Sequence, residues 1–301
     1  MNVLSLFDGM SCGQIALERA GIPVDNYFAS EINKYAMQVT QTNYPNTIQL
    51  GDVTKVVASK LPKIDLLIGG SPCQGFSFAG KQLNFEDPRS MLFFEYVRLL
   101  EELKPKHFLL ENVKMKKEFQ DVITNLVGVE PIEINSALVS AQNRKRLYWT
   151  NLPIQFPIAD RKIYLKDILE NGSVIADKSQ TILSTMWKEN AKSMVTRKKK
   201  GLLVKLGEIG AGGQGNRVYS IEGKGICMSA NSGGMAGSGN MLIQTGDRVR
   251  KLSPVECERL QTIPDSYTEG ISKTQRYKML GNGWTVDVIA HIFKGLLNEN
   301  L

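Results

Sequence analysis

The sequence has few of the residues that metal centres and disulfide frameworks need. It contains only two histidines, and its four cysteines, Cys12, Cys73, Cys227 and Cys257, form no C-x-x-C pair. We therefore expect neither a metal site nor a disulfide framework. The apolar runs are too short to cross a bilayer, and no signal-peptide pattern precedes the first predicted strand. A cytoplasmic protein without membrane association is expected.

The charge balance is moderately basic. Lysine and arginine number 37 against 30 acidic residues, which gives a formal net charge of +7 on 301 residues. Such a charge suits a polyanionic partner, although many proteins that bind no polyanion share it. The length allows one α/β domain and a smaller second one.

The first 53 residues predict three strand ends that carry ligand-binding groups. The strand Asn2–Phe7 leads through a glycine-containing loop into a helix, and a second strand, Tyr27–Ser30, ends in Glu31. At that distance from the loop, Glu31 is placed to bind a ribose diol, and Asp52 is placed to bind the amine of an adenine. Each carboxylate has an alternative interpretation as a helix cap or a solvated charge.

The same loop lacks two phosphate-binding signatures. It contains neither G-x-G-x-x-G nor the Walker Gly-Lys-Ser/Thr sequence, so neither a dinucleotide nor a nucleoside triphosphate is favoured. An adenosine-bearing cofactor without those phosphates fits better. S-adenosylmethionine is such a cofactor.

A cysteine follows the next predicted strand. The apolar run Leu66–Ile68 stops at Gly69–Pro72, and Cys73 comes next, at a position where α/β sheets present reactive groups. As a thiolate, Cys73 is a candidate nucleophile; the alternative is a small buried apolar residue. The irregular stretch that follows, up to the helix predicted from Met91, is expected to be a mobile lid that carries the cysteine.

Further charged candidates lie downstream. The strand His107–Leu110 ends in Glu111, and Arg144 and Arg146 alternate along a later strand, so we expect them on one face. Two adjacent guanidinium groups suit a phosphate or a polar base edge, whereas the alternative is a solvated edge strand.

Beyond Asn151 the sequence changes character. It loses long periodic segments and gains the basic run Arg197–Lys200 and two glycine-rich passages, at 210–217 and 231–240. These features are often a solvated face and linkers, but they also suit contact with a nucleic-acid groove. Ser253 then predicts a helix cap with Pro254 in the first turn and Glu256 completing a capping box. We expect domains at 1–156 and 157–247, with 248–301 returning to the first domain.

Six motifs together carry a family resemblance over nearly the whole chain outside residues 157–245. They occur in the order found in cytosine carbon-5 DNA methyltransferases of bacterial or phage type, which the chain resembles: Phe7-x-Gly9, Gly69–Ser77, Glu111–Val113, Gln142-x-Arg144-x-Arg146, Arg250–Glu256 and Gly281–Asn282. The first motif, with Ser11 and Cys12 in place of further glycine, is closer to animal de novo methyltransferases.

The resemblance implies a fold and a reaction. The fold is a Rossmann-like α/β methyltransferase domain with a mostly parallel sheet and a smaller, loop-rich target-recognition domain. The reaction is DNA (cytosine-5)-methylation, in which Cys73 adds to carbon 6 of a flipped-out cytosine and Glu111 holds ring nitrogen 3. Arg146 contacts the carbonyl oxygen of the base, and Arg144 positions the cysteine loop or a phosphate.

The resemblance also implies the cofactor and partners. S-adenosylmethionine is expected to contact residues from the first loops and three later motifs: Phe7, Asp8, Gly9, Glu31, Ile32, Asp52, Val53, Pro72, Leu92 and Asn282. Double-stranded DNA is the expected substrate, a cognate restriction endonuclease is an expected partner if the enzyme belongs to a restriction system, and a monomer is the default assembly.

Two alternatives to DNA methylation are considered. The tRNA-methylating branch of the family carries a Cys-Phe-Thr tripeptide before its last motifs, whereas this chain has Cys257-Glu258-Arg259, which favours DNA. A non-enzymatic DNA-binding regulator is expected to lose the nucleophile or the acid, but Cys73 and Glu111 are both present.

Overall fold

The computed structural model describes residues 1–71, 88–170, 205–208, 216–228, 241–245 and 248–300. The chain divides into two compact units. Unit 1 comprises Met1–Asn135, Lys145–Pro157 and Val286–Leu301, and unit 2 comprises Ser136–Arg144 and Ile158–Thr285. The domain boundaries expected from the sequence, at residues 156 and 247, stay predictions.

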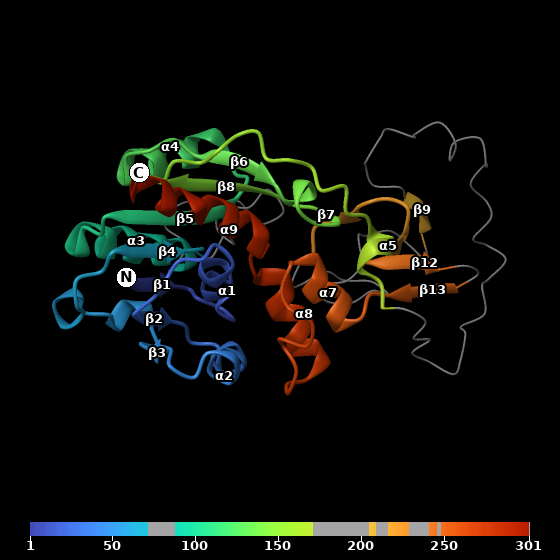
Figure 1. Ribbon diagram of the computed structural model, residues 1–301, viewed down its shortest axis with the longest axis horizontal. Coiled ribbons are helices and arrows are strands. Elements are labelled where there is room, and N and C mark those ends of the chain that lie inside the picture. The colour runs from blue at the N-terminus through green and yellow to red at the C-terminus, as the bar shows by residue number, and fades with distance from the viewer. Residues whose placement is uncertain (72–87, 171–204, 209–215, 229–240, 246–247, 301) are drawn as a thin grey trace. The chain divides into compact units, whose positions relative to one another are not determined.

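Unit 1 is built on one sheet (Figure 1). Among the described residues its seven strands lie in the order β3 (Ile48–Gln49), β2 (Asn26–Ser30), β1 (Asn2–Leu6), β4 (Leu66–Gly69), β5 (His107–Val113), β8 (Lys145–Thr150) and β6 (Ile132–Asn135). The neighbours from β3 to β5 pair in parallel, and β8 pairs antiparallel with both β5 and β6. The predicted Rossmann-like α/β fold with a mostly parallel sheet is confirmed.

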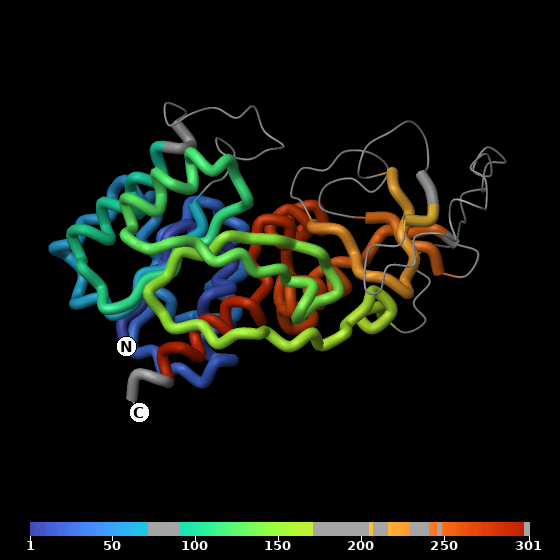
Figure 2. Tube along the Cα trace, turned by 90° about the horizontal axis from the view of Figure 1, so that it is seen from above, coloured from blue at the N-terminus to red at the C-terminus, as the bar shows by residue number. Residues whose placement is uncertain are grey.

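Helices cover both faces of this sheet. They are α1 (Cys12–Arg19), α2 (Lys34–Asn43), α3 (Pro88–Leu103), α4 (Lys117–Val127) and α9 (Val286–Phe293), with short turns η1 (Val53–Lys55), η2 (Ala58–Lys60) and η6 (Lys294–Asn300). Figures 1 and 2 show α1 and α9 on one face and α3 and α4 on the other. An ion pair between Arg19 and Asp287 joins α1 to α9.

The core of unit 1 explains why the strands read as apolar runs. Leu4 and Leu6 of β1 pack with Phe93 of α3 and Trp149 of β8, and all four are fully buried or nearly so. Each fully buried side chain of this kind contributes about 1.5–3 kcal/mol. Val3, on the other face of β1, is also buried, because helices cover both faces.

Unit 2 holds smaller sheets. In its described part, four strands lie in the order β13 (Arg248–Lys251), β12 (Leu242–Thr245), β10 (Arg217–Ser220) and β9 (Lys205–Glu208), and β11 (Gly225–Ile226) pairs with β7 (Gln142–Asn143). The helical segments are η3 (Ser136–Leu138), α5 (Leu165–Ile168), α7 (Pro254–Leu260) and α8 (Lys273–Asn282). The basic run and the passage 231–240 lie outside the described residues, and the passage 210–217 is described only at its last two residues.

The cap predicted at the start of α7 is confirmed. The Ser253 hydroxyl accepts a hydrogen bond from the Glu256 backbone N–H, and the Glu256 carboxylate accepts one from the Ser253 N–H. Arg250 donates to both oxygens of the same carboxylate, at 2.7 Å each. The motif that begins at Arg250 therefore forms the N-terminus of α7, which these hydrogen bonds hold in place.

Within the described residues, none of the helices combines the length and the apolar character that crossing a membrane requires.

Candidate active site

The strands β4 and β5 bring two motifs to one edge of the sheet. They pair in parallel with Gly69 opposite Leu110, so the residues after each strand leave from neighbouring positions. The Asn112 side-chain amide donates to the Ser71 hydroxyl at 3.1 Å, and both side chains are buried. Pro72 and Cys73 lie outside the described residues. The segment leading to Cys73 is thus anchored beside Glu111.

Glu111 forms a close ion pair with Arg146. The Arg146 Nε lies 3.0 Å from Glu111 Oε1, and the Glu111 residue is only 9% exposed. The antiparallel register of β5 and β8 produces the contact, because Glu111 lies opposite Tyr148 and Arg146 lies opposite Val113. A charge-assisted bond of this kind fixes the orientation of the carboxylate. A base that contacted the Glu111 carboxylate would therefore also lie close to the Arg146 guanidinium.

Arg144 belongs to unit 2 and is held within it. Its Nη1 donates to Cys227 Sγ and the Met228 carbonyl at 3.2 Å each, and its Nη2 donates to the Gly283 carbonyl at 3.0 Å. A further bond of 3.4 Å reaches the carbonyl of Gly281, at the end of α8. The guanidinium therefore links the segment after β11 to the end of α8. Its action on the cysteine segment or on a phosphate stays a prediction.

The loop after β1 has an unusual backbone. Phe7, Gly9 and Ser11 all adopt left-handed conformations, with φ of 57°, 61° and 59°. In a residue other than glycine, such a conformation costs about 1–3 kcal/mol and persists only where the surroundings impose it. The loop is thus shaped by its contacts rather than by local preference.

Glu31 connects this loop to the next one. Its Oε2 accepts a hydrogen bond from the Gly9 N–H at 2.8 Å, and its Oε1 accepts bonds from the N–H groups of Ile32 and Asn33 at 2.7 Å. Asn33 caps α2, so this helix begins at Lys34. Ile32 is left on the loop, and this residue is 76% exposed.

The remaining predicted cofactor residues differ in exposure. Asp52 accepts hydrogen bonds from the N–H and hydroxyl of Thr54, which lower the pKa of its carboxyl. Val53 is buried and Leu92 is half-buried against the core of unit 1. Asn282 is exposed at the end of α8 in unit 2.

The loops after β1, β2 and β3 can bind an adenosine-bearing cofactor. These strands are parallel neighbours in the sheet, so the loops leave from the same edge. They present the fixed carboxylate of Glu31, the ionised carboxylate of Asp52 and the exposed apolar side chain of Ile32. Carboxylates suit hydroxyl and amine donors, and an apolar side chain suits the face of an aromatic base. The residues therefore fit S-adenosylmethionine, and each individual contact stays a prediction.

Asp8 directs its carboxyl group into the protein. Oδ1 accepts a hydrogen bond from the Tyr27 hydroxyl at 2.8 Å, and Oδ2 accepts one from the Ser11 hydroxyl. Burial raises the pKa of Asp8 to about 6, although hydrogen bonds from Ser11, Ser5 and Tyr27 lower it in part.

This raised pKa predicts a pH-dependent stability. Because the ordinary pKa is 3.8 and the folded value is about 6, the folded protein binds this proton more tightly than the unfolded chain. The stabilisation is complete below the lower value and is lost as pH rises through the upper one, by up to about 3 kcal/mol. Relative to Asp8→Asn, the unfolding free energy of the unmodified protein in urea should fall between about pH 4 and pH 7. Parallel curves for the two proteins would contradict this assignment.

Among the described residues no metal site is evident. In the part of the chain that the structure describes, histidine, cysteine and acidic side chains form no group able to hold a metal ion.

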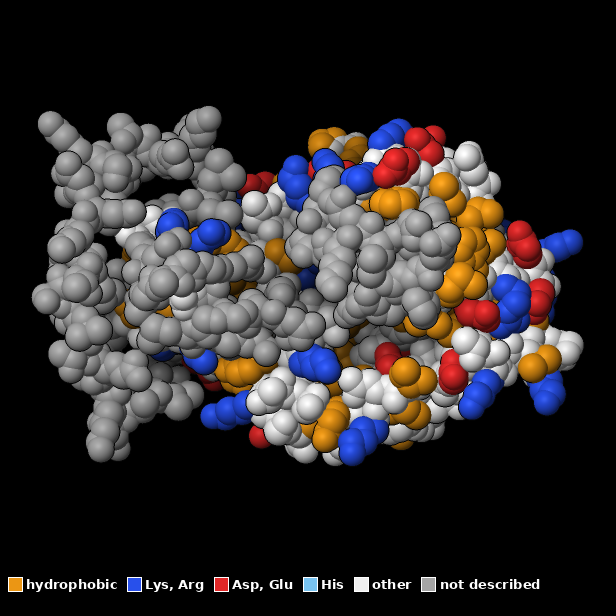
Figure 3. Space-filling model, turned by 180° about the vertical axis from the view of Figure 1, so that it is seen from behind, with side chains coloured by type: hydrophobic (Ala, Val, Ile, Leu, Met, Phe, Trp, Pro, Cys, Tyr) orange, Lys and Arg blue, Asp and Glu red, His pale blue; other side chains and the backbone are white. Residues whose placement is uncertain are grey.

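On the face shown in Figure 3, the described Lys and Arg side chains are interspersed with Asp and Glu. Within unit 1, Lys114 forms an ion pair with Glu133, and Lys117 forms one with Asp121.

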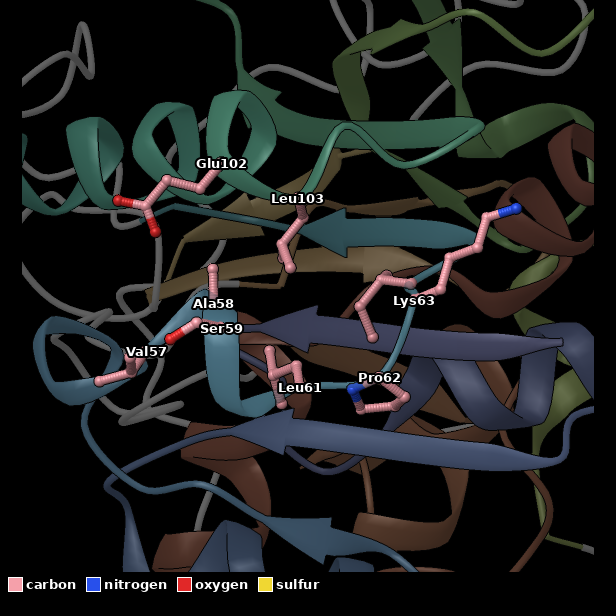
Figure 4. Close-up of a pocket in the computed structure, with 9 residues that line it drawn as sticks. Val57, Ala58, Ser59, Leu61, Pro62, Lys63, Glu102 and Leu103 are labelled. Carbon is pink, nitrogen blue, oxygen red and sulfur yellow. The ribbon is translucent and has the colours of Figure 1, made fainter.

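A cavity of about 450 Å³ lies elsewhere in unit 1 (Figure 4). Its walls include Leu61 and Ile64, which precede β4, and Leu103 at the end of α3. These residues lie at the amino ends of the strands, away from the edge where β4 and β5 end. None of the predicted site residues that the structure describes lines this cavity.

Two contacts at the site were not anticipated from the sequence. Tyr27 was predicted only as a strand residue, yet its hydroxyl binds Asp8. Asn112 stands inside the motif Glu111–Val113, but its bond to Ser71 was not expected. A polar side chain within an apolar strand is the signal that could have identified Tyr27, since a buried hydroxyl needs a partner.

Comparisons with known proteins show which family and which fold the chain is similar to. The family described as C-5 cytosine-specific DNA methylase matches residues 1–298. The chain is 33% identical to the type II methyltransferase M.HhaI of Haemophilus parahaemolyticus, over 97% of this chain and 93% of that protein. It is 31% identical to the type II methyltransferase M1.ScrFI of Lactococcus lactis subsp. cremoris, over 98% of this chain and 77% of that protein. The crystal structure of the S. pombe Dnmt2 methyltransferase superposes with a TM-score of 0.72 at 18% identity, covering 100% of this chain and 99% of that one, which shows a shared fold.

Proposed function

The chain belongs to the C-5 cytosine-specific DNA methylase family, and on that premise we propose that it methylates carbon 5 of a cytosine flipped out of a specific short sequence in duplex DNA. The enzymes of this family use S-adenosylmethionine as methyl donor. The observation that carries the proposal is the Glu111–Arg146 ion pair beside the anchored segment that leads to Cys73.

Cys73 supplies the nucleophile. Carbon 5 of cytosine is a poor nucleophile, so the thiolate first forms a bond to carbon 6, and the displaced electron pair makes the ring an enamine. When bound, S-adenosylmethionine would supply an electrophilic methyl group for carbon 5, with the methyl–sulfonium bond breaking and S-adenosylhomocysteine leaving. Loss of the proton from carbon 5 and cleavage of the carbon–sulfur bond then restore the aromatic ring and release the thiolate.

Glu111 and Arg146 stabilise the charge that this addition places on the ring. A carboxyl group that holds a proton at ring nitrogen 3 relieves negative charge there. The bond from Arg146 Nε to Glu111 fixes the carboxyl group in advance. The same guanidinium contacts the carbonyl oxygen of the base. One ion pair therefore both recognises the cytosine and activates it.

The substrate must leave the double helix to reach these groups. A stacked base cannot meet a thiol and a carboxyl group at carbon 6 and nitrogen 3 together, so the target cytosine flips out. Phosphate contacts then give an affinity that falls with salt, while base contacts give the sequence preference. We further propose that the protein acts as a monomer, alone or beside a cognate restriction endonuclease.

The test is transfer of a labelled methyl group. Purified protein and S-adenosylmethionine with a tritiated methyl group are incubated with duplex DNA, with single-stranded DNA and with RNA, and each product is digested to nucleosides. We expect label in 5-methyldeoxycytidine from duplex DNA. Label confined to RNA, or to another nucleoside, would overturn the proposal.

Ile32 offers a test of the cofactor site that spares the fold. Because Ile32 is 76% exposed, Ile32→Asp should leave the melting temperature unchanged. Loss of its apolar contact should raise the KM for S-adenosylmethionine at least about tenfold. Val57→Asp changes another exposed apolar residue, 47% exposed and remote from the predicted site, and should leave KM unchanged. Equal KM values in all three proteins would contradict the role of Ile32.

A further inference from the structure

The side chain of Tyr27 holds the loop that follows β1. It lies on β2, is 4% exposed, and donates its hydroxyl to Asp8 Oδ1 at 2.8 Å. Burial and the nearby Asp8 charge raise the pKa of Tyr27 well above its ordinary value, so the hydroxyl keeps the proton that it donates. The contact ties the loop after β1 to the neighbouring strand.

Ser11 completes the attachment on the other side of Asp8. Its hydroxyl donates to Asp8 Oδ2 and accepts hydrogen bonds from Gln14 Nε2 and Thr40 Oγ1, each at 3.2 Å. A hydroxyl has one donor and two acceptor sites, so this one is fully used. The network therefore joins the loop to α1 and α2.

The loop backbone needs such a network. Phe7 and Ser11 are left-handed without being glycine, at φ of 57° and 59°. Strained residues of this kind cluster where a ligand requires a fixed geometry. Asp8 lies between them, and the hydrogen bonds to both of its oxygens are among the described side-chain contacts that hold this stretch in place.

We propose that Tyr27 is a positioning residue for the cofactor, acting through Asp8 to hold the backbone from Phe7 to Gly9 in the conformation that binds S-adenosylmethionine. This inference rests on the proposed function. Because Tyr27 is only 4% exposed, the proposed effect passes along the chain from Asp8 to Gly9 and requires no contact between Tyr27 and the cofactor.

The contacts also predict which kinetic quantity changes when the hydrogen bond from Tyr27 is lost. The Gly9 N–H binds Glu31 Oε2, so a displaced loop also releases the carboxylate predicted to bind the ribose. Both effects weaken binding of the cofactor. Neither reaches the Glu111–Arg146 pair on β5 and β8, which acts on the base. The KM for the cofactor therefore rises while kcat stays near its original value.

The test compares two matched tyrosine variants. Tyr27→Phe removes the hydroxyl that binds Asp8, and Tyr44→Phe removes a hydroxyl that donates to Glu18 Oε2 at 2.9 Å rather than to a loop residue. Calorimetric titration with S-adenosylmethionine and steady-state kinetics are measured for each protein. Since hydrogen bonds to charged groups are among the stronger ones, we expect Tyr27→Phe to bind about tenfold more weakly with kcat within about twofold, and Tyr44→Phe to be unchanged.

Other outcomes have defined meanings. Equal cofactor affinity in Tyr27→Phe and the unmodified protein overturns the inference alone. An unmodified protein that binds no S-adenosylmethionine overturns the proposed function and this inference with it. If Tyr27→Phe does not fold, Ser11→Gly tests the same network, because glycine accepts the left-handed backbone and lacks the hydroxyl. Its cofactor affinity should fall in the same way, and unchanged affinity overturns the inference.

Discussion

Cys73→Ala protein is expected to transfer methyl groups to duplex DNA at least about 10³-fold more slowly than the unmodified enzyme, because alanine cannot form the bond to carbon 6 that Cys73 is proposed to form. Cofactor binding should be retained, since the loops after β1 and β2 hold their shape through their own contacts. Single-turnover transfer of a tritiated methyl group measures the rate, and calorimetry measures the binding.

The matched control replaces a different cysteine. Cys257→Ala removes a thiol that is fully buried on α7, where burial raises its pKa and keeps it unreactive. This variant should keep its methyl-transfer activity. A Cys73→Ala protein that methylates DNA at the unmodified rate would refute the covalent mechanism.

Glu111→Gln is expected to lower kcat by about 10²–10⁴-fold, which is the usual contribution of a positioned acid. Glutamine keeps the size of the side chain and an oxygen that can accept the bond from Arg146, but it cannot supply a proton to ring nitrogen 3. The KM for the cofactor should change little. Steady-state kinetics at saturating cofactor and DNA measures the effect.

A neighbouring carboxylate provides the comparison. Glu133 on β6 binds Lys114 at 2.8 Å and Lys145 at 3.0 Å, and these bonds lower the pKa of its carboxyl. Glu133→Gln also removes one negative charge from unit 1, but it should leave kcat within about threefold of the original value, since exposed ion pairs contribute about 0–1 kcal/mol. Equal losses in the two variants would mean that Glu111 acts only through the local charge.

Local sequence signals predicted much of unit 1. The strands β1, β2, β4 and β5 were anticipated because apolar runs ended by glycine, proline or acidic residues carry that information within a few positions. The capping box at Ser253 was anticipated for the same reason. The resemblance to a family then directed attention to Glu111 and Arg146, which the structure joins in an ion pair.

The contacts that organise the site depend on long-range pairing. Arg144 reaches Cys227 and Gly283, which are 83 and 139 positions away in the chain. It lies between β7, which pairs with β11, and β8, which pairs with β5 and β6. The alternation of side chains along one predicted strand does not indicate that the segments before and after Arg144 pair in different sheets. The bond from Tyr27 to Asp8 likewise depends on the packing of neighbouring strands rather than on any local pattern.

The most direct test of the central claim is bisulfite sequencing of a random-sequence duplex library after incubation with the protein and S-adenosylmethionine, with Cys73→Ala in parallel. Cytosines methylated at carbon 5 resist conversion. The proposed function predicts protected cytosines in one short sequence context with the unmodified protein and none with Cys73→Ala. A folded, cofactor-binding protein that left every cytosine convertible would contradict it.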